Sequence, residues 1–279
     1  MKFRAKVVDV ACIDRFIRVL TTIAKMTHLC VLRITEDKMF FILNDNVCKG
    51  NIWCEVTASN FFDEFNMEGV SSDANEIYLE VTPDDLVRAA KTAQFAKSLK
   101  IKLTKKLSPC LTFFVELCSV SGHSRNVNHD VPVNVIPKRL WDDFQEPTIP
   151  DFDVSINMPS LKFLKNVVER MKNIGSYLEL SANQNGDMTL KVESQMATVS
   201  THFKSLQVQY FDDEPSVSTR NKDEMFGAKI DIKRFQTFFS GLQLNPQKII
   251  CNIVDNRLVH FLLLQEDLSL QYSMPIVQQ

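Results

Sequence analysis

The chain has 279 residues, 45% of them hydrophobic and 24% charged, which is typical of a globular protein with one large or two modest domains. Its formal net charge is −2 and it holds only 7 glycines, which argues against a uniformly basic nucleic-acid binder and against glycine-rich nucleotide loops. The odd number of cysteines, 7, favours a reducing compartment. We expect no signal peptide, because charged residues interrupt the apolar ones at the N-terminus. We also expect no membrane span, because no apolar run approaches roughly 20 residues.

The first half of the chain predicts strands and two helices. A strand at 2–8 precedes a helix at 11–26, in which apolar residues recur at helical spacing. Strands are expected at 29–35, 38–43, 51–56 and 77–81. Thr82-Pro83-Asp84-Asp85 predicts the start of a second helix, over 84–98, because a capping residue, an early proline and acidic side chains suit a helix N-terminus. Further strands are expected at 98–105, 110–119 and 125–135.

The second half repeats this order at an offset of about 149 residues. Helices at 160–173 and 231–243 match those of the first half, as do strands at 178–192, 247–252 and 259–266, and a last strand is expected near 268–277. Asn185-Gly186 between two alternating runs predicts a hairpin. Two copies of one unit, each with two helices packed on antiparallel sheet, predict an α+β fold. Two unrelated α+β domains with the same element order remain the alternative.

We place an N-terminal domain at 1–136, a connecting linker at 137–152 and a C-terminal domain at 153–279. The linker is predicted from three prolines and the lack of a regular period. Leu140, Trp141 and Phe144 give it more apolar bulk than a passive tether needs. These side chains either dock partner proteins or hold the linker against the sheets, and the sequence leaves both interpretations open.

Positive charge is concentrated on the predicted helices. The four helix ranges contain 12 basic and 5 acidic residues, whereas the rest of the chain contains 20 basic and 29 acidic ones. Such a surface attracts phosphates, and the scarcity of aromatic residues among these bases favours contact with the nucleic-acid backbone over base stacking. Ordinary solvated helix faces are the alternative. The candidate DNA-facing residues are Arg15, Arg18, Lys25, Arg88, Lys91, Lys162, Lys165, Lys172, Lys233 and Arg234.

No motif for catalysis or cofactor binding is present. The chain has no phosphate-binding loop and no nucleophile elbow, and its only close histidine pair, His123 and His129, lacks a ligand cluster at metal spacing. We therefore expect no catalytic residue, no cofactor and no metal. An enzyme that assembles Cys/His chemistry in three dimensions is the alternative from another class.

Several stretches resemble the sliding clamps of the PCNA type. These are Met158-Pro159-Ser160 with Phe163, Ile174-Gly175, Phe238-Phe239, and Leu270-Gln271-Tyr272 followed by Pro275. The whole chain resembles, more closely, the Hus-type subunits of the heterotrimeric DNA-damage checkpoint clamp, the nine-one-one complex. The matching stretches are Met1–Lys6, Trp53–Glu55, Met67–Ser71, Asn75–Glu80, His129–Pro132, Thr201–Lys204 and Cys251–Val254. Residues 209–225 fit this family poorly and are expected to form a variable loop.

The resemblance implies a non-catalytic subunit of a ring with two different sister subunits, closed around double-stranded DNA. It further implies that an ATP-dependent clamp loader places the ring at damage sites, where it supports checkpoint signalling and repair enzymes. The resemblance also implies that the protein is located in the nucleus, and in the cytoplasm before the ring assembles. No contact with a membrane is implied. A homotrimeric replicative clamp is the alternative within this class.

Clamps close their rings by pairing edge strands, and the resemblance assigns two such strands here. One is the final strand of the first copy, at 125–135, and the other is the strand near 196–204. The residues expected at the subunit interfaces are Val127, Val131 and Val133 on the first strand, and Ala197, Val199 and Phe203 on the second.

Overall fold

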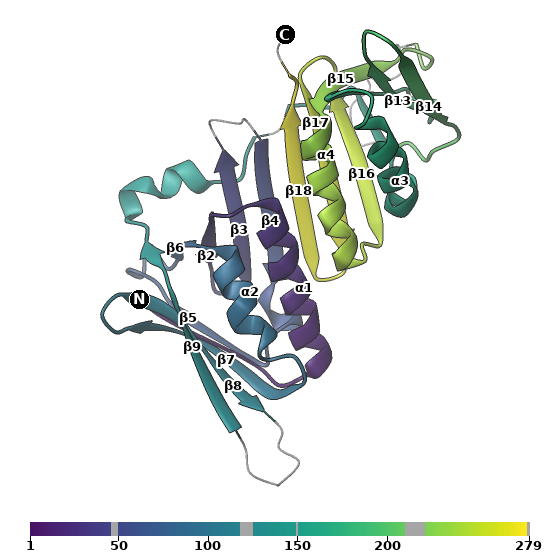
Figure 1. Cartoon of the computed structure of the whole chain (residues 1–279). Coiled ribbons are helices and arrows are strands. Elements are labelled where there is room, and N and C mark those ends of the chain that lie inside the picture. The colour runs from purple at the N-terminus through teal and green to yellow at the C-terminus, as the bar shows by residue number, and fades with distance from the viewer. Residues whose placement is uncertain (46–49, 118–124, 149, 210–220, 278–279) are drawn as a thin grey trace. The chain divides into compact units, whose positions relative to one another are not determined.

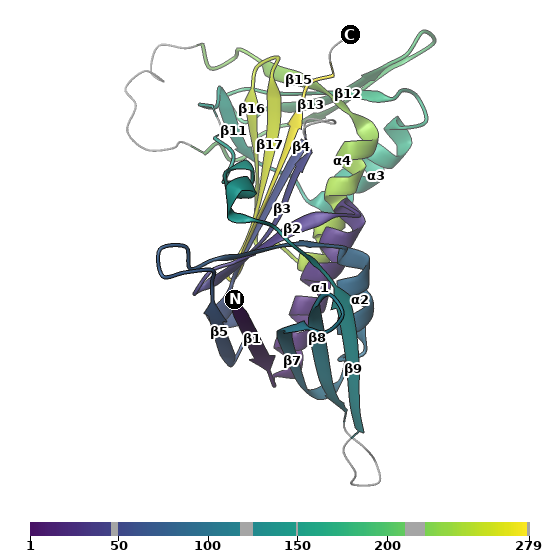
Figure 2. The same ribbon diagram turned by 90° about the vertical axis from the view of Figure 1, so that its left-hand side faces the viewer.

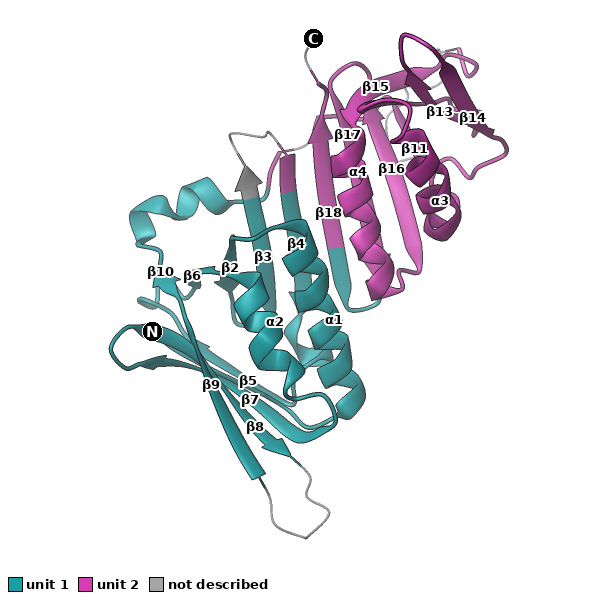
Figure 3. Ribbon diagram, viewed as in Figure 1, with its two compact units in different colours: residues 1–44, 52–146, 266–269 teal, residues 45–51, 147–265, 270–279 magenta. Residues whose placement is uncertain are grey.

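The computed structural model describes residues 1–45, 50–117, 125–148, 150–209 and 221–277. Two compact units are coloured separately in Figure 3. Unit 1 contains the described residues of 1–44, 52–146 and 266–269, and unit 2 contains those of 45–51, 147–265 and 270–279. A short segment from near the C-terminus therefore belongs to the unit built mainly from the N-terminal half.

Unit 1 has two groups of strands (Figures 1 and 2). Its five-stranded antiparallel sheet has the order β5-β1-β7-β8-β9, with β1 at Lys2–Val7, β5 at Glu64–Glu68, β7 at Ala96–Lys105, β8 at Pro109–Leu117 and β9 at Arg125–Pro132. The other strands have the order β10-β6-β2-β3-β4, with β2 at Cys30–Ile34, β3 at Lys38–Asp45, β4 at Gly50–Thr57, β6 at Ile77–Val81 and β10 at Asn134–Val135. β9 lies at one edge of the five-stranded sheet.

Two helices pack side by side in unit 1, α1 at Val10–Met26 and α2 at Pro83–Lys91 (Figure 1). Asp9 caps α1, because its carboxylate accepts hydrogen bonds from the backbone N–H groups of Ala11 (3.3 Å) and Cys12 (3.2 Å). Pro83 begins α2, with two acidic residues in the first turn. Short 3-10 helices are found at Ala58–Asn60 (η1) and Lys138–Phe144 (η2).

Unit 2 repeats this plan. Its four-stranded sheet has the order β14-β13-β12-β15, with β12 at Tyr177–Ala182, β13 at Met188–Glu193, β14 at Thr198–Phe203 and β15 at Phe226–Asp231. The other strands run in the order β18-β17-β16-β11, with β11 at Val154–Asn157, β16 at Lys248–Val254, β17 at Leu258–Gln265 and β18 at Leu268–Pro275. The helices are α3 at Leu161–Met171 and α4 at Ile232–Phe238, followed by a 3-10 helix, η4, at Phe239–Leu244.

The hairpin between β12 and β13 requires its glycine. Gly186 has φ +84°, and a Cβ at this position would lie 2.1 Å from the carbonyl oxygen of Leu206. The hairpin predicted from Asn185-Gly186 is confirmed, and the α+β class with two helices and antiparallel strands in each copy is confirmed as well.

The structure also departs from the predicted elements. α2 ends at Lys91 and β7 begins at Ala96, because Phe95 between them has φ +64°, which a helix cannot contain. β5, β11 and β15 were not predicted. β11 lies near the repeat offset from β1, and β15 near the offset from β6, so both extend the repeat. Part of the predicted linker forms η2 within unit 1.

Candidate nucleic-acid interface

Apolar packing on one side of α1 and α2 leaves their basic residues on the other. α1 buries Ile13, Phe16 and Leu20, while Arg18 and Lys25 are exposed. In α2, Arg88 and Lys91 are exposed next to the buried Leu86, Ala89 and Ala90. The helical spacing of the apolar positions therefore places these four cations on solvent-facing surface.

Helices α3 and α4 of unit 2 show the same division. Lys162, Lys165 and Lys172 are exposed on or directly after α3, and Lys233 is exposed in the first turn of α4. Arg234, in contrast, is only half-exposed, and its backbone carbonyl lies 3.4 Å from the hydroxyl of Tyr272. The structure therefore gives Arg234 less access to a ligand than the sequence predicted.

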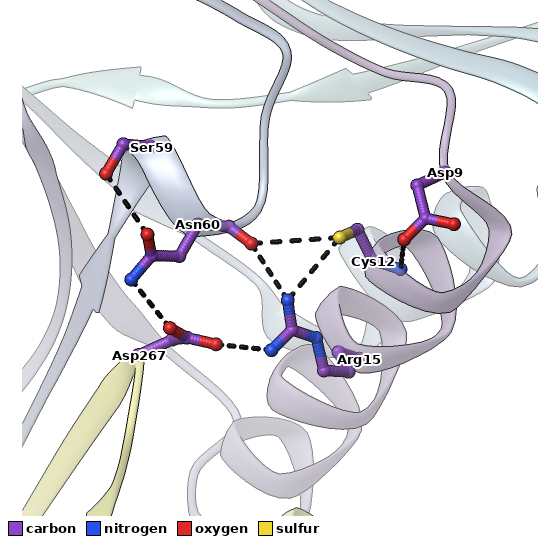
Figure 4. Close-up of polar contacts among 6 residues, drawn as sticks. All are labelled: Asp9, Cys12, Arg15, Ser59, Asn60 and Asp267. Atoms are coloured by element: carbon purple, nitrogen blue, oxygen red, sulfur yellow. Dashed lines mark hydrogen bonds and ion pairs between the residues drawn. The ribbon is translucent and has the colours of Figure 1, made fainter.

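Arg15 does not match its predicted role as a free surface base (Figure 4). Its guanidinium forms an ion pair with Asp267, donates a 2.8 Å hydrogen bond to the backbone oxygen of Asn60 and lies 5.0 Å from the centre of the Phe61 ring. Asn60 also donates a 2.6 Å hydrogen bond from Nδ2 to Asp267. The charge of Arg15 is therefore compensated inside unit 1, although 36% of its side chain is exposed.

Three of the other bases have an acidic neighbour on their own helix. Arg18 pairs with Asp14 at 2.5 Å, Arg88 with Asp85 at 2.8 Å and Lys172 with Glu169 at 2.5 Å. Exposed pairs of this kind contribute only about 0.2–1 kcal/mol each, so a phosphate can compete for the cation. Within the described residues, Lys25, Lys91, Lys162, Lys165 and Lys233 form no ion pair at all.

The two strands assigned to subunit contact are both edge strands. β9 ends the five-stranded sheet of unit 1, and β14 ends the four-stranded sheet of unit 2. An edge strand leaves backbone donors and acceptors free on one side, which is what pairing with another chain requires. Both strands therefore have the edge position that such pairing needs.

The side chains on these two edges differ. Val131 and Val133 are buried in unit 1, contrary to their expected role at an apolar edge, and Val127 is half-buried. Strand alternation explains this result, since the same alternation turns Asn126, Asn128 and Asp130 outward. β9 therefore presents mainly polar groups.

β14 presents both polar and apolar groups, because Thr198, Ser200 and His202 are exposed along with Val199. Ala197 and Val199 are exposed, and Met196 just before the strand is 96% exposed. Phe203 is half-buried and meets Phe163 of α3 edge to face, with ring centres 6.0 Å apart. Phe163 is itself 54% exposed and was not among the predicted interface residues. Its position on the polar side of a predicted helix could have revealed it.

Trp141 is not an exposed docking residue. It is 7% exposed, stacks on Tyr78 with ring centres 4.5 Å apart, and donates a 3.0 Å hydrogen bond from Nε1 to the backbone oxygen of Ile136. Phe144 is partly buried against the hydrophobic cluster that contains Trp141 and Tyr78. Of the three predicted linker residues only Leu140 is exposed, at 41%. For Trp141 and Phe144 the structure supports the interpretation that the linker is held against the sheet.

The described residues offer no obvious catalytic or metal site. They contain no group of three or more His, Cys, Asp or Glu side chains that could hold a metal ion, and His123 lies outside them. Burial raises the pKa of the Cys30 thiol to about 12 and also raises the pKa of Cys54 and Cys251, which opposes thiolate formation. In the part of the chain that the structure describes, no helix is long and apolar enough to cross a membrane.

Comparison with known proteins shows similarity along the whole chain. The family model for Hus1-like protein matches residues 1–278. Human Checkpoint protein HUS1 is 52% identical over 277 residues, covering 99% of both chains. Checkpoint protein Hus1-like of Drosophila melanogaster is 28% identical over 99% of both chains. Among solved structures, proliferating cellular nuclear antigen from Entamoeba histolytica matches with a TM-score of 0.72 and 14% identity over 99% of both chains, which shows a shared fold.

Proposed function

Because the chain belongs to the Hus1-like protein family, we propose that it is a non-catalytic subunit of a ring-shaped checkpoint clamp that encloses double-stranded DNA. The observation that carries this proposal is the set of exposed helix lysines without acidic partners among the described residues, in a chain with net charge −2. Such lysines attract phosphates regardless of base sequence, as a ring that slides along DNA requires.

We further propose that the ring contains two different sister subunits and that an ATP-dependent clamp loader places it at damage sites in the nucleus. The exposed apolar residues at and just before β14, Met196, Ala197 and Val199, have no large apolar counterpart among the exposed residues of β9, which supports unlike neighbours. The ring would support checkpoint signalling and act as a platform for DNA-repair enzymes. Leu140 remains the exposed linker residue suited to contact them.

A direct test is the retention of the assembled ring on closed circular DNA. We expect the combined variant Lys25→Glu, Lys91→Glu, Lys162→Glu and Lys165→Glu to weaken retention strongly. The affinity of the variant should also depend less on salt. The slope of log affinity against log salt concentration should become shallower by about 0.9 for each phosphate that the ring no longer neutralises. Folding should be unaffected, since each exposed helix position tolerates such a change within roughly 0.5 kcal/mol.

The matched control carries the same four charge reversals outside the helices, at Lys105, Lys138, Arg139 and Lys222, all of which are exposed. Retention of the control ring should equal that of the wild type. If the helix variant and the control lose retention to the same extent, total charge is responsible and the helices do not face DNA. Unchanged retention of both would also contradict the proposal.

A further inference from the structure

A hollow of about 380 Å³ lies on the five-stranded sheet of unit 1, over β7, β8 and β9. These three strands lie together in the lower part of Figure 2. Lys100 and Lys102 of β7, Phe114 of β8, and Asn126 and Asn128 of β9 line it. All five side chains lie on the side of the sheet opposite to the buried Leu99, Ile101 and Phe113, so the hollow opens to solvent.

The register of the sheet arranges these side chains in rows. Lys100 pairs with Phe114, and Phe114 pairs with Asn128, so the three form one row across the strands. Lys102 lies two residues along β7 from Lys100, and Asn126 two residues along β9 from Asn128. Each of these steps is about 6.6 Å, and the lysine and asparagine strands are about 9.6 Å apart. The phenyl ring of Phe114 therefore lies between two lysines and two amides.

The two lysines carry positive charge that no ion pair compensates. Neither is paired with an acid among the residues that the structure describes, and Lys102 Nζ lies 5.5 Å from the centre of the Phe114 ring. The acids around them are engaged elsewhere. Glu64 pairs with Arg4 (2.8 Å) and Lys6 (3.3 Å) of β1.

Glu116, at one end of the hollow, accepts hydrogen bonds from Lys97 (3.1 Å) and Ser98 (3.2 Å). The bond from Lys97 is the main cause that lowers the pKa of Glu116, so this carboxylate stays ionised at neutral pH. Because Lys97 offsets the charge of Glu116, Lys100 and Lys102 set the net charge at the hollow, and they attract an anionic ligand.

We propose that this hollow binds an extended acidic segment of a partner protein. Alternate side chains of an extended peptide are spaced about 6.6 Å apart, as Lys100 and Lys102 are, so two carboxylates two residues apart can meet both lysines. The amides of Asn126 and Asn128 both donate and accept hydrogen bonds, which suits a peptide backbone. A nucleic-acid strand is a poorer fit, because it carries a phosphate at every step whereas only two cations line the hollow.

The site is independent of the proposed DNA contact, which uses the helices. It is also compatible with pairing of β9 to a neighbouring subunit, since strand pairing uses the backbone edge and leaves the face of the sheet open. The segment would thus reach the ring from outside while both other surfaces are occupied.

The test uses the purified full chain and a short fluorescein-labelled peptide with glutamate at alternate positions, monitored by fluorescence anisotropy. A peptide with glutamine in place of glutamate is the second probe. We expect the glutamate peptide to bind in a salt-sensitive manner and the glutamine peptide to bind much more weakly. The double variant Lys100→Glu, Lys102→Glu should weaken binding about tenfold, since two favourable charge pairs become repulsive.

The matched control, Lys105→Glu with Lys138→Glu, changes the charge equally outside the hollow and should bind as the wild type does. A milder variant, Lys100→Gln with Lys102→Gln, keeps the test valid if the charge reversal disturbs folding, and it too should reduce affinity. Equal binding of both peptides, equal loss in the control, or unchanged binding by the glutamine variant each overturn the proposal. A single-stranded oligonucleotide that competes for the same lysines more strongly than the peptide does would overturn it as well.

Discussion

Asp267 is a nearly buried carboxylate, and two side chains bind it. Only 9% of its side chain is exposed, and Arg15 and Asn60 approach it from different elements of unit 1. A carboxylate that loses its cation in such surroundings keeps the cost of desolvation without the compensating charge. The pair therefore stabilises unit 1 more than the exposed pairs on the helices do.

We predict that Arg15→Met lowers the free energy of unfolding of unit 1 by about 1–3 kcal/mol, the usual cost of leaving a buried polar group without its partner. Arg18→Met, which breaks only the exposed pair with Asp14, should change it by less than about 0.5 kcal/mol. Urea unfolding followed by tryptophan fluorescence measures both, because Trp53 and Trp141 are buried in unit 1. Equal effects of the two substitutions would contradict the structural role of Arg15.

His260 of β17 is buried between two amides. Its Nδ1 lies 3.0 Å from Asn252 Nδ2, its Nε2 lies 3.3 Å from Gln271 Oε1, and its ring stacks on Phe152 at 5.7 Å. The neutral ring with its proton on Nε2 satisfies both contacts, because Asn252 donates to Nδ1 and Nε2–H donates to Gln271. Burial lowers the pKa of His260, and the hydrogen bond to Gln271 only partly opposes this shift.

A lowered pKa means that the unfolded chain binds the proton more readily than the folded one. Stability from neutral His260 is therefore present above the ordinary histidine pKa of about 6.5 and is lost as pH falls below it. We predict that the thermal midpoint of the wild type falls more between pH 7.5 and pH 5.5 than that of His260→Gln, measured by circular dichroism. Parallel loss in both proteins would show that other groups cause the pH dependence.

At the scale of elements, the helices and the unit 2 hairpin were predictable because their determinants are local. The apolar spacing of α1, the Thr82-Pro83 start of α2 and the Asn185-Gly186 turn each lie within a few residues of one another. The end of α2 was not predictable in this way, because no glycine or proline marks it and the positive φ falls on Phe95, a residue type that rarely adopts it.

Features that depend on residues far apart in the chain could not be predicted from the sequence. Trp141 is apolar in a proline-rich stretch, which suggests exposure, but its partner Tyr78 lies on β6, far away along the chain. The compensation of Arg15 likewise comes from a segment near the C-terminus. Among the candidate site residues, therefore, the helix lysines have the exposure that was predicted, whereas the residues whose position depends on tertiary packing do not.

A further prediction concerns the pairing of the edge strands β9 and β14 with neighbouring chains. Ser200→Pro removes a backbone N–H that β14 turns to its free edge, and Asn128→Pro does the same in β9, so each should block one ladder between neighbouring chains. We expect assembly with the sister subunits to weaken by at least about tenfold, measured by size-exclusion chromatography with mass detection. Ser200→Thr, which keeps the N–H, should assemble normally. Unchanged affinity in both proline variants would place the interface elsewhere.

At the scale of the whole molecule, an excess of positive charge on the helices coexists with an excess of acids elsewhere, at a net charge of −2. Such a distribution concentrates attraction for phosphates on selected surfaces even though the net charge is close to zero. The fold is shared with proliferating cellular nuclear antigen from Entamoeba histolytica at 14% identity, and a shared fold does not by itself define what a chain contacts.

Oligomeric state separates the checkpoint clamp from a replicative one. We predict that the purified chain alone does not form a stable homotrimer, because the apolar residues at and just before β14 have no large apolar counterpart among the exposed residues of β9. Mixed with both sister subunits, it should enter an assembly that contains one copy of each. Analytical ultracentrifugation measures both cases. A stable homotrimer of the chain alone would favour the replicative function.

The link between Arg15 and Asp267 also constrains when unit 1 can finish folding. The two residues are 252 positions apart, and the segment 266–269 belongs to unit 1 although it follows almost the entire chain. During synthesis at about 5–20 residues per second, α1 leaves the ribosome on the order of ten to fifty seconds before its carboxylate partner exists. Until Asp267 has been synthesised, Arg15 has no carboxylate at this site to bind. The contact between Arg15 and Asp267 is therefore among the last that unit 1 can form during translation.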